Sequence, residues 1–234
     1  MTDYALLTTG LEQLGVAFHP QAVENLLQFS LLLLEKNKVM NLTAVTDPTE
    51  VVTRHFLDCA VLAPHLGAGE HVLDVGTGAG FPGLPLAILC PKTQFTLLDA
   101  QRKRVDFLTE TIAALGLLNC IAVHARAEDF AKLHRAAFDH AVSRAVAGLR
   151  VLSELALPMV KVGGSFFAMK AADCIEEVEA AAHACAVLGA PAPTLLRYTV
   201  PHDGIDRVLV RLHKTADTPA QYPRRFKKIQ TDPL

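Results

Sequence analysis

A glycine-rich turn directly after a short apolar run limits the folds open to this chain. Residues 71–75 read His-Val-Leu-Asp-Val, and residues 74–83 read Asp-Val-Gly-Thr-Gly-Ala-Gly-Phe-Pro-Gly. Glycines let a ligand approach the backbone closely, and the N–H groups that open a following helix present hydrogen-bond donors. Ligands of α/β proteins bind at the carboxyl ends of the strands. The sequence therefore predicts an α/β sheet with a binding site at the end of residues 71–75.

Apolar runs downstream of this turn alternate with helical periodicity. Further strand-like runs lie at residues 95–99, 121–124, 140–143 and 164–170. Each is short and apolar, which is typical of strands buried on both faces. Between two of these runs, residues 104–115 place Val105, Leu108, Ile112 and Leu115 on one helical face. This alternation predicts a mostly parallel sheet with right-handed crossovers.

The two ends of the chain depart from this pattern. Residues 1–66 predict helices, since leucines repeat at helical spacing as far as Gly15 and prolines at positions 20 and 48 open further segments. Residues 171–188 predict another helix, and residues 195–212 predict a hairpin around a His-Asp-Gly turn. We therefore expect three parts: a helical extension at 1–66, a ligand-binding domain at 67–214 and a basic tail at 215–234.

Composition places the chain among soluble globular proteins. It has 234 residues, of which 51% are hydrophobic and 20% charged, enough for one large core. The longest apolar stretch, Leu26 to Leu34, is far short of the roughly 20 residues of a membrane span. The start Met-Thr-Asp does not resemble a signal peptide. The five cysteines are scattered and never form a C-x-x-C pair, so we expect a cytoplasmic protein with free thiols and without a metal site.

Positive charge gathers at the C-terminal end. The net charge is −2, but residues 197–234 hold eight Lys or Arg against four Asp, so this end carries +4 and the remainder −6. The densest cluster reads Arg-Arg-Phe-Lys-Lys at positions 224–228. Four cations around an aromatic ring suit contact with phosphates and stacking on a base. A solvated, solubilising end fits the same cluster, and the two alternatives stay open at this point.

Three chemistries compete for the glycine-rich turn. A phosphate-binding P-loop needs Lys and then Ser or Thr after its second glycine, but Leu-Pro follows Gly83. A nicotinamide dehydrogenase motif, G-x-G-x-x-G, matches Gly78, Gly80 and Gly83, with Asp99 at the expected distance. That alternative stays open, although Pro82 stands where the dinucleotide motif expects helix. The third pattern, D-x-G-x-G-x-G, resembles the first motif of S-adenosylmethionine (SAM)-dependent methyltransferases.

The methyltransferase resemblance gives roles to two acidic residues. It implies that Asp99, at the end of the second strand, accepts hydrogen bonds from both ribose hydroxyls of SAM. It also implies that Ala127 and Glu128, after the third strand, border the adenine. Taken singly, each carboxylate fits a helix cap or a solvated surface group better than a ligand contact. Because each follows a successive predicted strand, the pair favours the cofactor.

A combination of motifs resembles one family within that class. These motifs are Asn-Leu-Thr at 41–43, Arg-His-Phe-Leu-Asp at 54–58, Gly-Ala-Gly-Phe-Pro-Gly at 78–83, Arg-Ala-Glu at 126–128 and Ser-Arg-Ala at 143–145. The family is the small-subunit ribosomal RNA (guanine-N7) methyltransferases, also called glucose-inhibited division protein B. The resemblance implies a class I methyltransferase fold, a seven-stranded mostly parallel α/β sheet with an N-terminal helical extension. It implies methyl transfer from SAM to guanine N7 in the 530 loop of 16S rRNA, with the 30S ribosomal subunit as partner. The cofactor contacts that it implies are Gly76, Gly78, Phe81, Asp99, Ala100, Gln101, Ala127, Glu128 and Arg144.

The residues after the fourth predicted strand bear on the accepting atom. Methylation of a base amine usually goes with Asp/Asn-Pro-Pro-aromatic, whereas residues 143–146 read Ser-Arg-Ala-Val. Carbon-5 methylation needs a cysteine nucleophile there, and Cys120 and Cys174 are off position. Ribose methylation would pair Lys170 with an acid where Ser143 stands. Guanine N7 carries a free lone pair, so we expect no general base and no catalytic proton shuttle, only alignment of the reactants.

Basic residues are assigned to alignment and to RNA contact. We expect Arg144, Arg54 and His55 to position the reactants. The expected RNA-binding residues are Arg54, Lys103, Lys170, Arg224, Arg225 and Lys227. Two other functions stay open, namely a nicotinamide-dependent oxidoreductase and a non-catalytic ribosome-assembly factor.

Overall fold

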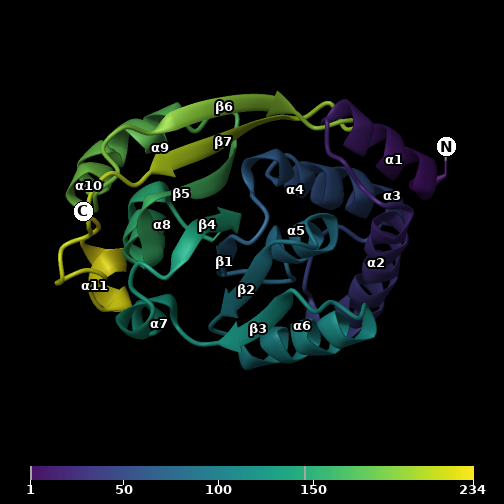
Figure 1. Cartoon of the computed structure of the whole chain (residues 1–234), viewed down its shortest axis with the longest axis horizontal. Coiled ribbons are helices and arrows are strands. Elements are labelled where there is room, and N and C mark those ends of the chain that lie inside the picture. Colours follow the sequence, from purple (N-terminus) through teal and green to yellow (C-terminus); the bar gives the residue numbers. More distant parts are fainter. Residues whose placement is uncertain (1, 145) are drawn as a thin grey trace.

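The chain folds around one seven-stranded sheet with helices on both faces (Figure 1). A computed structural model describes residues 2–144 and 146–234. Met1 and Ala145 lie outside the described residues, so nothing is said of the last residue of the Ser-Arg-Ala motif. The strand order is β3-β2-β1-β4-β5-β7-β6. The expected mostly parallel α/β sheet with N-terminal helices is confirmed.

The strands alternate with helices along the chain and pair mostly in parallel, as expected. Their bounds are β1 His71–Val75, β2 Gln94–Asp99, β3 Cys120–His124, β4 Phe138–Arg144, β5 Val160–Ala171, β6 Thr194–Thr199 and β7 Asp206–His213. Strands β1 to β5 pair in parallel, and β7 runs antiparallel to both β5 and β6. The predicted hairpin is therefore β6–β7. The carboxyl ends of β1, β2 and β4 meet at one edge of the sheet, where the glycine turn lies.

The helices follow the predicted segments with two differences. Their bounds are α1 Asp3–Gln13, α2 Pro20–Met40, α3 Pro48–Val51, α4 Asp58–Ala60, α5 Gly83–Leu89, α6 Arg102–Ala114, α7 Ala127–Leu133, α8 Leu149–Ala156, α9 Ile175–Ala180, α10 Ala182–Val187 and α11 Phe226–Thr231. The helix expected at 171–188 is wrong in its bounds, because Ala171 still belongs to β5 and the helical part divides into α9 and α10. Between α3 and α4, residues Val52–Leu57 widen into a π-helical turn. Among the described residues, two short 3₁₀ turns, Ala63–His65 and Leu157–Met159, complete the helical elements.

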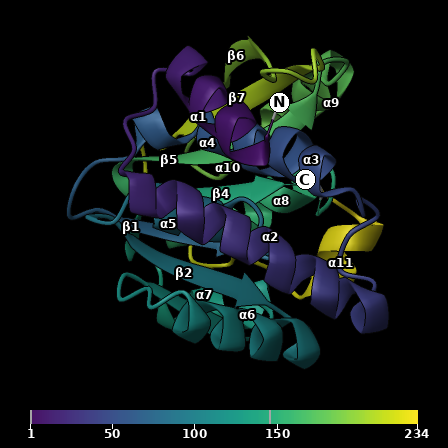
Figure 2. The same ribbon diagram turned by 90° about the vertical axis from the view of Figure 1, so that its right-hand side faces the viewer.

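The sheet separates two apolar cores. Val72 points into one core with α1, α2 and α5, whereas its neighbour Leu73 points into the other with α8 and α10. This opposition follows from the alternation of side chains along a strand. Helix α2 packs against both α1 and α5 on the first face (Figure 2). The N-terminal helices therefore share a core with the sheet.

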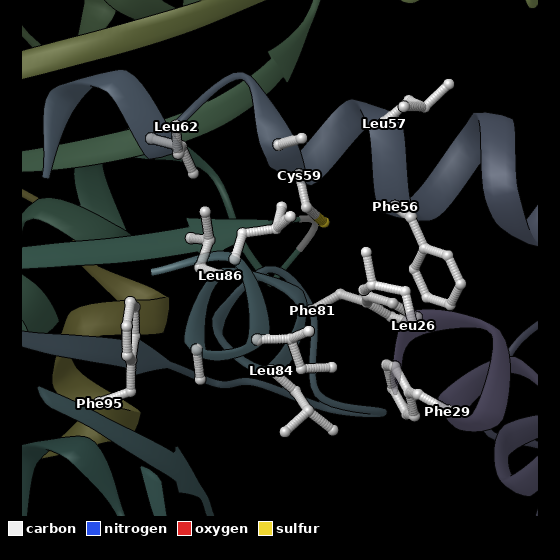
Figure 3. Packing of buried hydrophobic residues seen from close by; sticks show 14 of the residues in the cluster. Leu26, Phe29, Phe56, Leu57, Cys59, Leu62, Phe81, Leu84, Leu86 and Phe95 are labelled. Atoms are coloured by element: carbon white, nitrogen blue, oxygen red, sulfur yellow. The ribbon is translucent and has the colours of Figure 1, made fainter. Parts of the chain in front are cut away.

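An aromatic cluster joins the N-terminal helices to the glycine turn. The ring of Phe81, in the turn, lies 5.5 Å from Phe29 of α2 and 6.3 Å from Phe56 of the π-helical turn. Figure 3 shows these three rings together, with Leu26 and Leu84 beside them. Burial of each such side chain contributes about 1.5–3 kcal/mol. The helices thus hold the far end of the turn in place.

The C-terminal segment packs on the second face. Ile229 of α11 is fully buried in the core around α8. Arg224 forms an ion pair with Glu154 of α8, whose side chain has no exposed surface. The guanidinium donates from Nε at 2.8 Å and from Nη2 at 2.6 Å, and the backbone N–H of Arg224 adds a third bond at 2.8 Å. One cation of the basic cluster, Arg224, is therefore already paired with a buried carboxylate of the protein.

We predict that Arg224→Ala destabilises the protein by about 3 kcal/mol, because it leaves the Glu154 carboxylate buried without its partner. The neighbouring Arg225 is exposed, so Arg225→Ala is the matched control, with a change below about 0.5 kcal/mol. Urea unfolding of both variants measures the two values. Equal, small effects would contradict the structural role of Arg224.

Candidate functional site

The turn between β1 and α5 has a backbone that only glycine adopts readily. Gly76, Gly78 and Gly80 have φ angles of +72°, +61° and +103°, in the region that L-residues with side chains avoid. A Cβ on Gly83 would overlap Leu97 of β2 and the Asp74 carboxylate. The first three glycines therefore shape the turn, and the fourth lets α5 begin close to the sheet.

Asp74 ties the turn to the start of α5. Its Oδ2 accepts hydrogen bonds from the Thr77 hydroxyl at 2.7 Å and from the Gly83 N–H at 2.8 Å. The side chain is fully buried, and its Oδ1 has no hydrogen-bond partner among the described residues. Burial raises the pKa of Asp74 to about 7. A buried carboxyl whose charged form is disfavoured by burial thus holds the two ends of the turn together.

A cavity of about 420 Å³ opens above the turn, at the carboxyl edge of the sheet. It spans from Asp99, after β2, across the turn to Arg144 at the end of β4. The volume lies within the range of small-molecule sites. Its walls are Leu42, Thr43, His55, Gly76, Thr77, Gly78, Ala79, Phe81, Asp99, Ala100, Gln101, Arg104, Arg144 and Val146. The structure thus brings together every sequence-predicted cofactor residue except Ala127 and Glu128.

Asp99 presents its carboxylate at the β2 end of the cavity. Oδ2 accepts from the Gly78 N–H at 2.9 Å, and Oδ1 accepts from the Gln101 N–H at 2.7 Å. Arg104 Nη1 lies 3.5 Å from Oδ2. A carboxylate has about four lone-pair positions, so two backbone bonds fix its orientation while acceptor capacity remains. This arrangement suits a ligand that offers two neighbouring hydroxyl groups.

Arg144 occupies the opposite end and is held by a buried acid. Its Nη1 donates to Asp58 Oδ2 at 3.1 Å, and the Asp58 side chain is only 5% exposed. Asp58 Oδ1 accepts from the Tyr198 hydroxyl at 2.8 Å. Burial, and then the Asp58 charge, raises the pKa of Tyr198, so its hydroxyl stays protonated as the donor. Asp58 thus fixes Arg144 from one side and is itself fixed by β6.

His55 completes this end of the cavity. Its ring lies 4.5 Å from the ring of Phe81, and the Arg144 guanidinium stands 4.8 Å over the same Phe81 ring. Arg144 Nη2 donates to His55 Nδ1 at 3.1 Å. Burial, and then the nearby Arg144 charge, lowers the pKa of His55 to about 4. The imidazole is therefore neutral at physiological pH.

The sequence prediction missed several lining residues. Thr43 stands in a motif noted from the sequence, but no role was assigned to it. Tyr198 lies 140 residues from Asp58 in the chain, and no local pattern marks that contact. Val146 contacts the turn, since a Cβ on Gly76 would come within 2.8 Å of it. The glycine spacing alone could have indicated a close neighbour there, without identifying it.

Of the two predicted adenine residues, Glu128 borders a different cavity and Ala127 lines neither of the two. Glu128, at the start of α7, accepts from Arg126 Nε at 2.7 Å. Glu128 lines a second cavity of about 580 Å³ between α7 and the C-terminal segment, together with Arg224, Arg225 and Lys227. The guanidinium of Arg126 lies 4.9 Å from the centre of the Phe226 ring. The basic cluster therefore lies beside the residues expected to border adenine.

Two of the predicted RNA-binding residues are occupied by other contacts. Lys170 Nζ donates to Glu177 at 2.7 Å and to the Ala147 carbonyl at 3.0 Å, and its side chain is 11% exposed. Arg224 is held by Glu154, as described above. These two cations balance acids within the protein, a role that residue type alone did not reveal.

The remaining predicted RNA-binding residues lie at the surface. Arg54 pairs with Glu50 at 3.2 Å and with Asp203 at 3.4 Å, with 42% of its side chain exposed. Lys103, Arg225 and Lys227 are exposed, and none of the three forms an ion pair with residues that the structure describes. These side chains are accessible to a polyanion.

Neither a metal centre nor a membrane helix is found in the part of the chain that the structure describes. Within residues 2–144 and 146–234, His, Cys, Asp and Glu side chains form no group of three suited to a metal ion. The helices of the same residues include none with the length and apolarity to cross a bilayer.

Solved structures share this fold at low sequence identity. A putative transferase from Pyrococcus horikoshii matches 68% of the chain and 63% of its own length, with a TM-score of 0.54 and 17% identity. TYW2 from M. jannaschii, solved in complex with AdoMet, matches 66% of the chain and 72% of its own length, with a TM-score of 0.52 and 18% identity. Together with the strand order and the glycine turn, they define the fold as that of class I SAM-dependent methyltransferases.

Sequence relatives narrow the class to one family. Residues 22–199 match the family described as rRNA small subunit methyltransferase G, GidB. Ribosomal RNA small subunit methyltransferase G of Alkaliphilus metalliredigens is 42% identical over 96% of both chains. The protein of that name in Clostridium botulinum is 37% identical over the full length of both. The chain belongs to the rRNA small subunit methyltransferase G family, which confirms the resemblance found in the sequence.

We predict that Asp74→Asn changes how stability depends on pH. An unfolded Asp ionises near 3.8, whereas folded Asp74 ionises near 7, so the folded state binds more protons between these values. The contribution of Asp74 to stability is therefore present below about pH 4 and is lost as pH rises to about 7, by up to about 1.4 kcal/mol per pH unit. The amide keeps an oxygen acceptor for Thr77 and Gly83 and does not ionise.

The measurement is urea unfolding of the wild type and Asp74→Asn at several pH values from 4.5 to 7.5. The free energy of unfolding of the variant, minus that of the wild type, should increase as pH rises. A difference that stays constant over this range would show that Asp74 does not titrate as its burial implies.

Proposed function

We propose that this protein transfers a methyl group from SAM to N7 of a guanine in the 530 loop of 16S rRNA. The observation that carries the proposal is the single cavity that joins Asp99, the glycine turn and Arg144 in a chain of the rRNA small subunit methyltransferase G family. The family gives the substrate class, and the cavity gives the chemistry. We further propose that it acts in the cytoplasm on the 30S subunit or its RNA.

The residues of the cavity fit SAM. Asp99 offers oriented acceptors to the ribose hydroxyls, and the exposed backbone at Gly76 and Gly78 leaves room for close approach. Arg144 lies at the β4 end of the cavity, opposite Asp99, where its guanidinium could bind the carboxylate of SAM. When bound, SAM supplies an electrophilic methyl group on a positively charged sulfur.

The side chains at the Arg144 end are arranged to position a base and not to remove a proton. His55 Nδ1 accepts from Arg144, and its Nε2 contacts Thr43 at 2.9 Å, so both ring nitrogens are engaged. Asp58 holds Arg144 and Tyr198 and is buried. Neither group is free to act as a general base. Guanine N7 needs none, because its lone pair is unprotonated at neutral pH, and alignment of reactants is worth up to about 7–11 kcal/mol.

RNA contact is proposed for the exposed cations near this edge. Lys103 opens α6, just after the Asp99 end of the cavity, and Arg225 and Lys227 lie beside the cavity under α7. Arg54 lies next to His55. Contacts of this kind position the backbone without reading sequence, and they weaken as salt concentration rises. Lys170 and Arg224 are left out of this proposal, since each is paired with an acid of the protein.

The proposed reaction predicts a site-specific product. The protein is incubated with methyl-labelled SAM and with small-subunit RNA, free or as 30S particles, from cells that lack the modification. Label should appear at N7 of one guanine in the 530 loop, mapped by aniline cleavage. Asp99→Ala should lose the product, because the ribose hydroxyls lose their acceptor. SAM binding without label would overturn the substrate, and saturable NADH binding without SAM binding would support the oxidoreductase.

The same variant tests the non-catalytic alternative. If Asp99→Ala supports ribosome assembly in cells as well as the wild type does while making no methylated product, the cavity is dispensable for the cellular role. That result would favour an assembly factor over an enzyme.

The absence of a general base also predicts how the reaction rate depends on pH. Without a general base, the rate of methyl transfer from bound reactants should change less than about twofold between pH 6.5 and 8.5. Asp74→Asn is the control for the carboxyl that titrates near 7 beneath the turn. A tenfold rise in rate per pH unit in both proteins, with RNA binding unchanged, would show that a base takes part.

A further inference from the structure

The Thr43 hydroxyl has an unusual hydrogen-bond position in the cavity wall. The backbone of Thr43 is clamped by Asn37 of α2, whose amide accepts from the Thr43 N–H and donates to the Thr43 carbonyl, both at 2.9 Å. Its Oγ1 accepts from the Val45 N–H at 3.1 Å and lies 2.9 Å from His55 Nε2. The side chain is therefore held in place before any ligand binds.

The direction of the Thr43–His55 bond follows from Arg144. A guanidinium can only donate, so His55 Nδ1, at 3.1 Å from Arg144 Nη2, must accept. The imidazole is neutral, since burial and then Arg144 lower the pKa of His55 to about 4. Its single proton is then on Nε2, which donates to Thr43 Oγ1. The Arg54 carbonyl also lies 3.1 Å from Nδ1 and could accept a proton there, but a proton on Nδ1 would then face the Arg144 Nη2 donor at the same distance. The carbonyl accepts instead from Arg144 Nη1 at 3.2 Å, so both Arg144 donors and the Arg54 carbonyl are paired only when Nδ1 accepts.

Counting lone pairs then fixes what Thr43 offers to a ligand. A hydroxyl has two acceptor positions and one proton. The His55 and Val45 donors fill both acceptor positions, and Thr43 Oγ1 has no hydrogen-bond acceptor among the residues that the structure describes. Its proton is left for a group in the cavity that Thr43 lines. Thr43 is thus a donor that cannot switch to accepting.

The position of Thr43 in the cavity indicates which ligand group accepts its proton. It is linked through His55 to Arg144, at the β4 end of the cavity, whereas Asp99 stands at the β2 end. A ligand with hydroxyls at one end and a carboxylate at the other complements this polarity. Arg144 directs Nη1 to Asp58 and to the Arg54 carbonyl, so its capacity for a further anion is reduced. An added neutral donor beside it completes the site.

We propose that Thr43 donates a hydrogen bond to the carboxylate of the methionine part of SAM, and that His55 serves to fix the direction of that bond. The inference rests on SAM being the cofactor, as proposed above. Thr43 is a cofactor-binding residue, and His55 is a positioning residue that acts through it.

The test compares SAM with decarboxylated SAM, which lacks only the carboxylate, in calorimetric binding to the whole protein. Thr43→Val keeps the shape of the side chain and removes the hydroxyl, and it should weaken SAM binding about tenfold, as expected for a bond to a charged group. Binding of decarboxylated SAM should change less than about twofold. Thr43→Ser, which restores the hydroxyl, should bind SAM within about threefold of the wild type.

The outcomes separate the two levels of the proposal. Equal losses for both ligands in Thr43→Val would mean that the substitution disturbs the cavity generally, and unchanged SAM binding would mean that the hydroxyl makes no such bond. Either result overturns the role of Thr43. Failure of the wild type to bind SAM would instead overturn the proposed function. Circular dichroism and thermal unfolding of each variant establish that it folds.

Discussion

The buried Asp74 carboxyl is the interaction on which the site depends. It lies near the carboxyl end of β1 and accepts hydrogen bonds from the Thr77 hydroxyl, in the glycine turn, and from the N–H of Gly83, where α5 begins. These bonds force the intervening residues to close into a compact turn over the end of the strand. Glycine adopts the positive φ angles of this turn without steric strain, so the turn can close. Gly78 can then donate to Asp99, and the cavity acquires its floor.

The second constraint comes from outside the sheet domain. Phe81 extends from the same turn into the core formed with α2 and the π-helical turn, and His55 and Arg144 also lie against its ring. One ring therefore links the turn, the N-terminal helices and the end of β4. Through this contact, the N-terminal segment contributes two residues to a cavity whose other wall is built by the sheet: Thr43 from the loop after α2, and His55 from the π-helical turn.

The role of each basic residue depends on whether it is paired with an acid of the protein, and not on its place in the sequence. The basic cluster near the C-terminus divides into cations that neutralise protein acids and cations that face solvent. Arg224 belongs to the first group because Glu154 is fully buried, whereas Arg225 and Lys227 belong to the second. Lys170 likewise balances Glu177. A count of basic residues thus overstates the surface available to RNA, and only their contacts show which ones remain accessible.

The sequence by itself determined the succession of strands and helices along the chain, the place of the glycine turn and the family. These features are local: strand and helix periodicities repeat within a few residues, and motif spacing fixes which residues follow which strand. The tertiary structure decided the rest. The bond from Tyr198 to Asp58, the pairing of Arg224 with Glu154 and the orientation of the Thr43 hydroxyl join segments that are distant in the chain or depend on the partners of a neighbour. Hydrogen-bond direction and burial arise only when the chain is packed, so no pattern of residue types could have specified them.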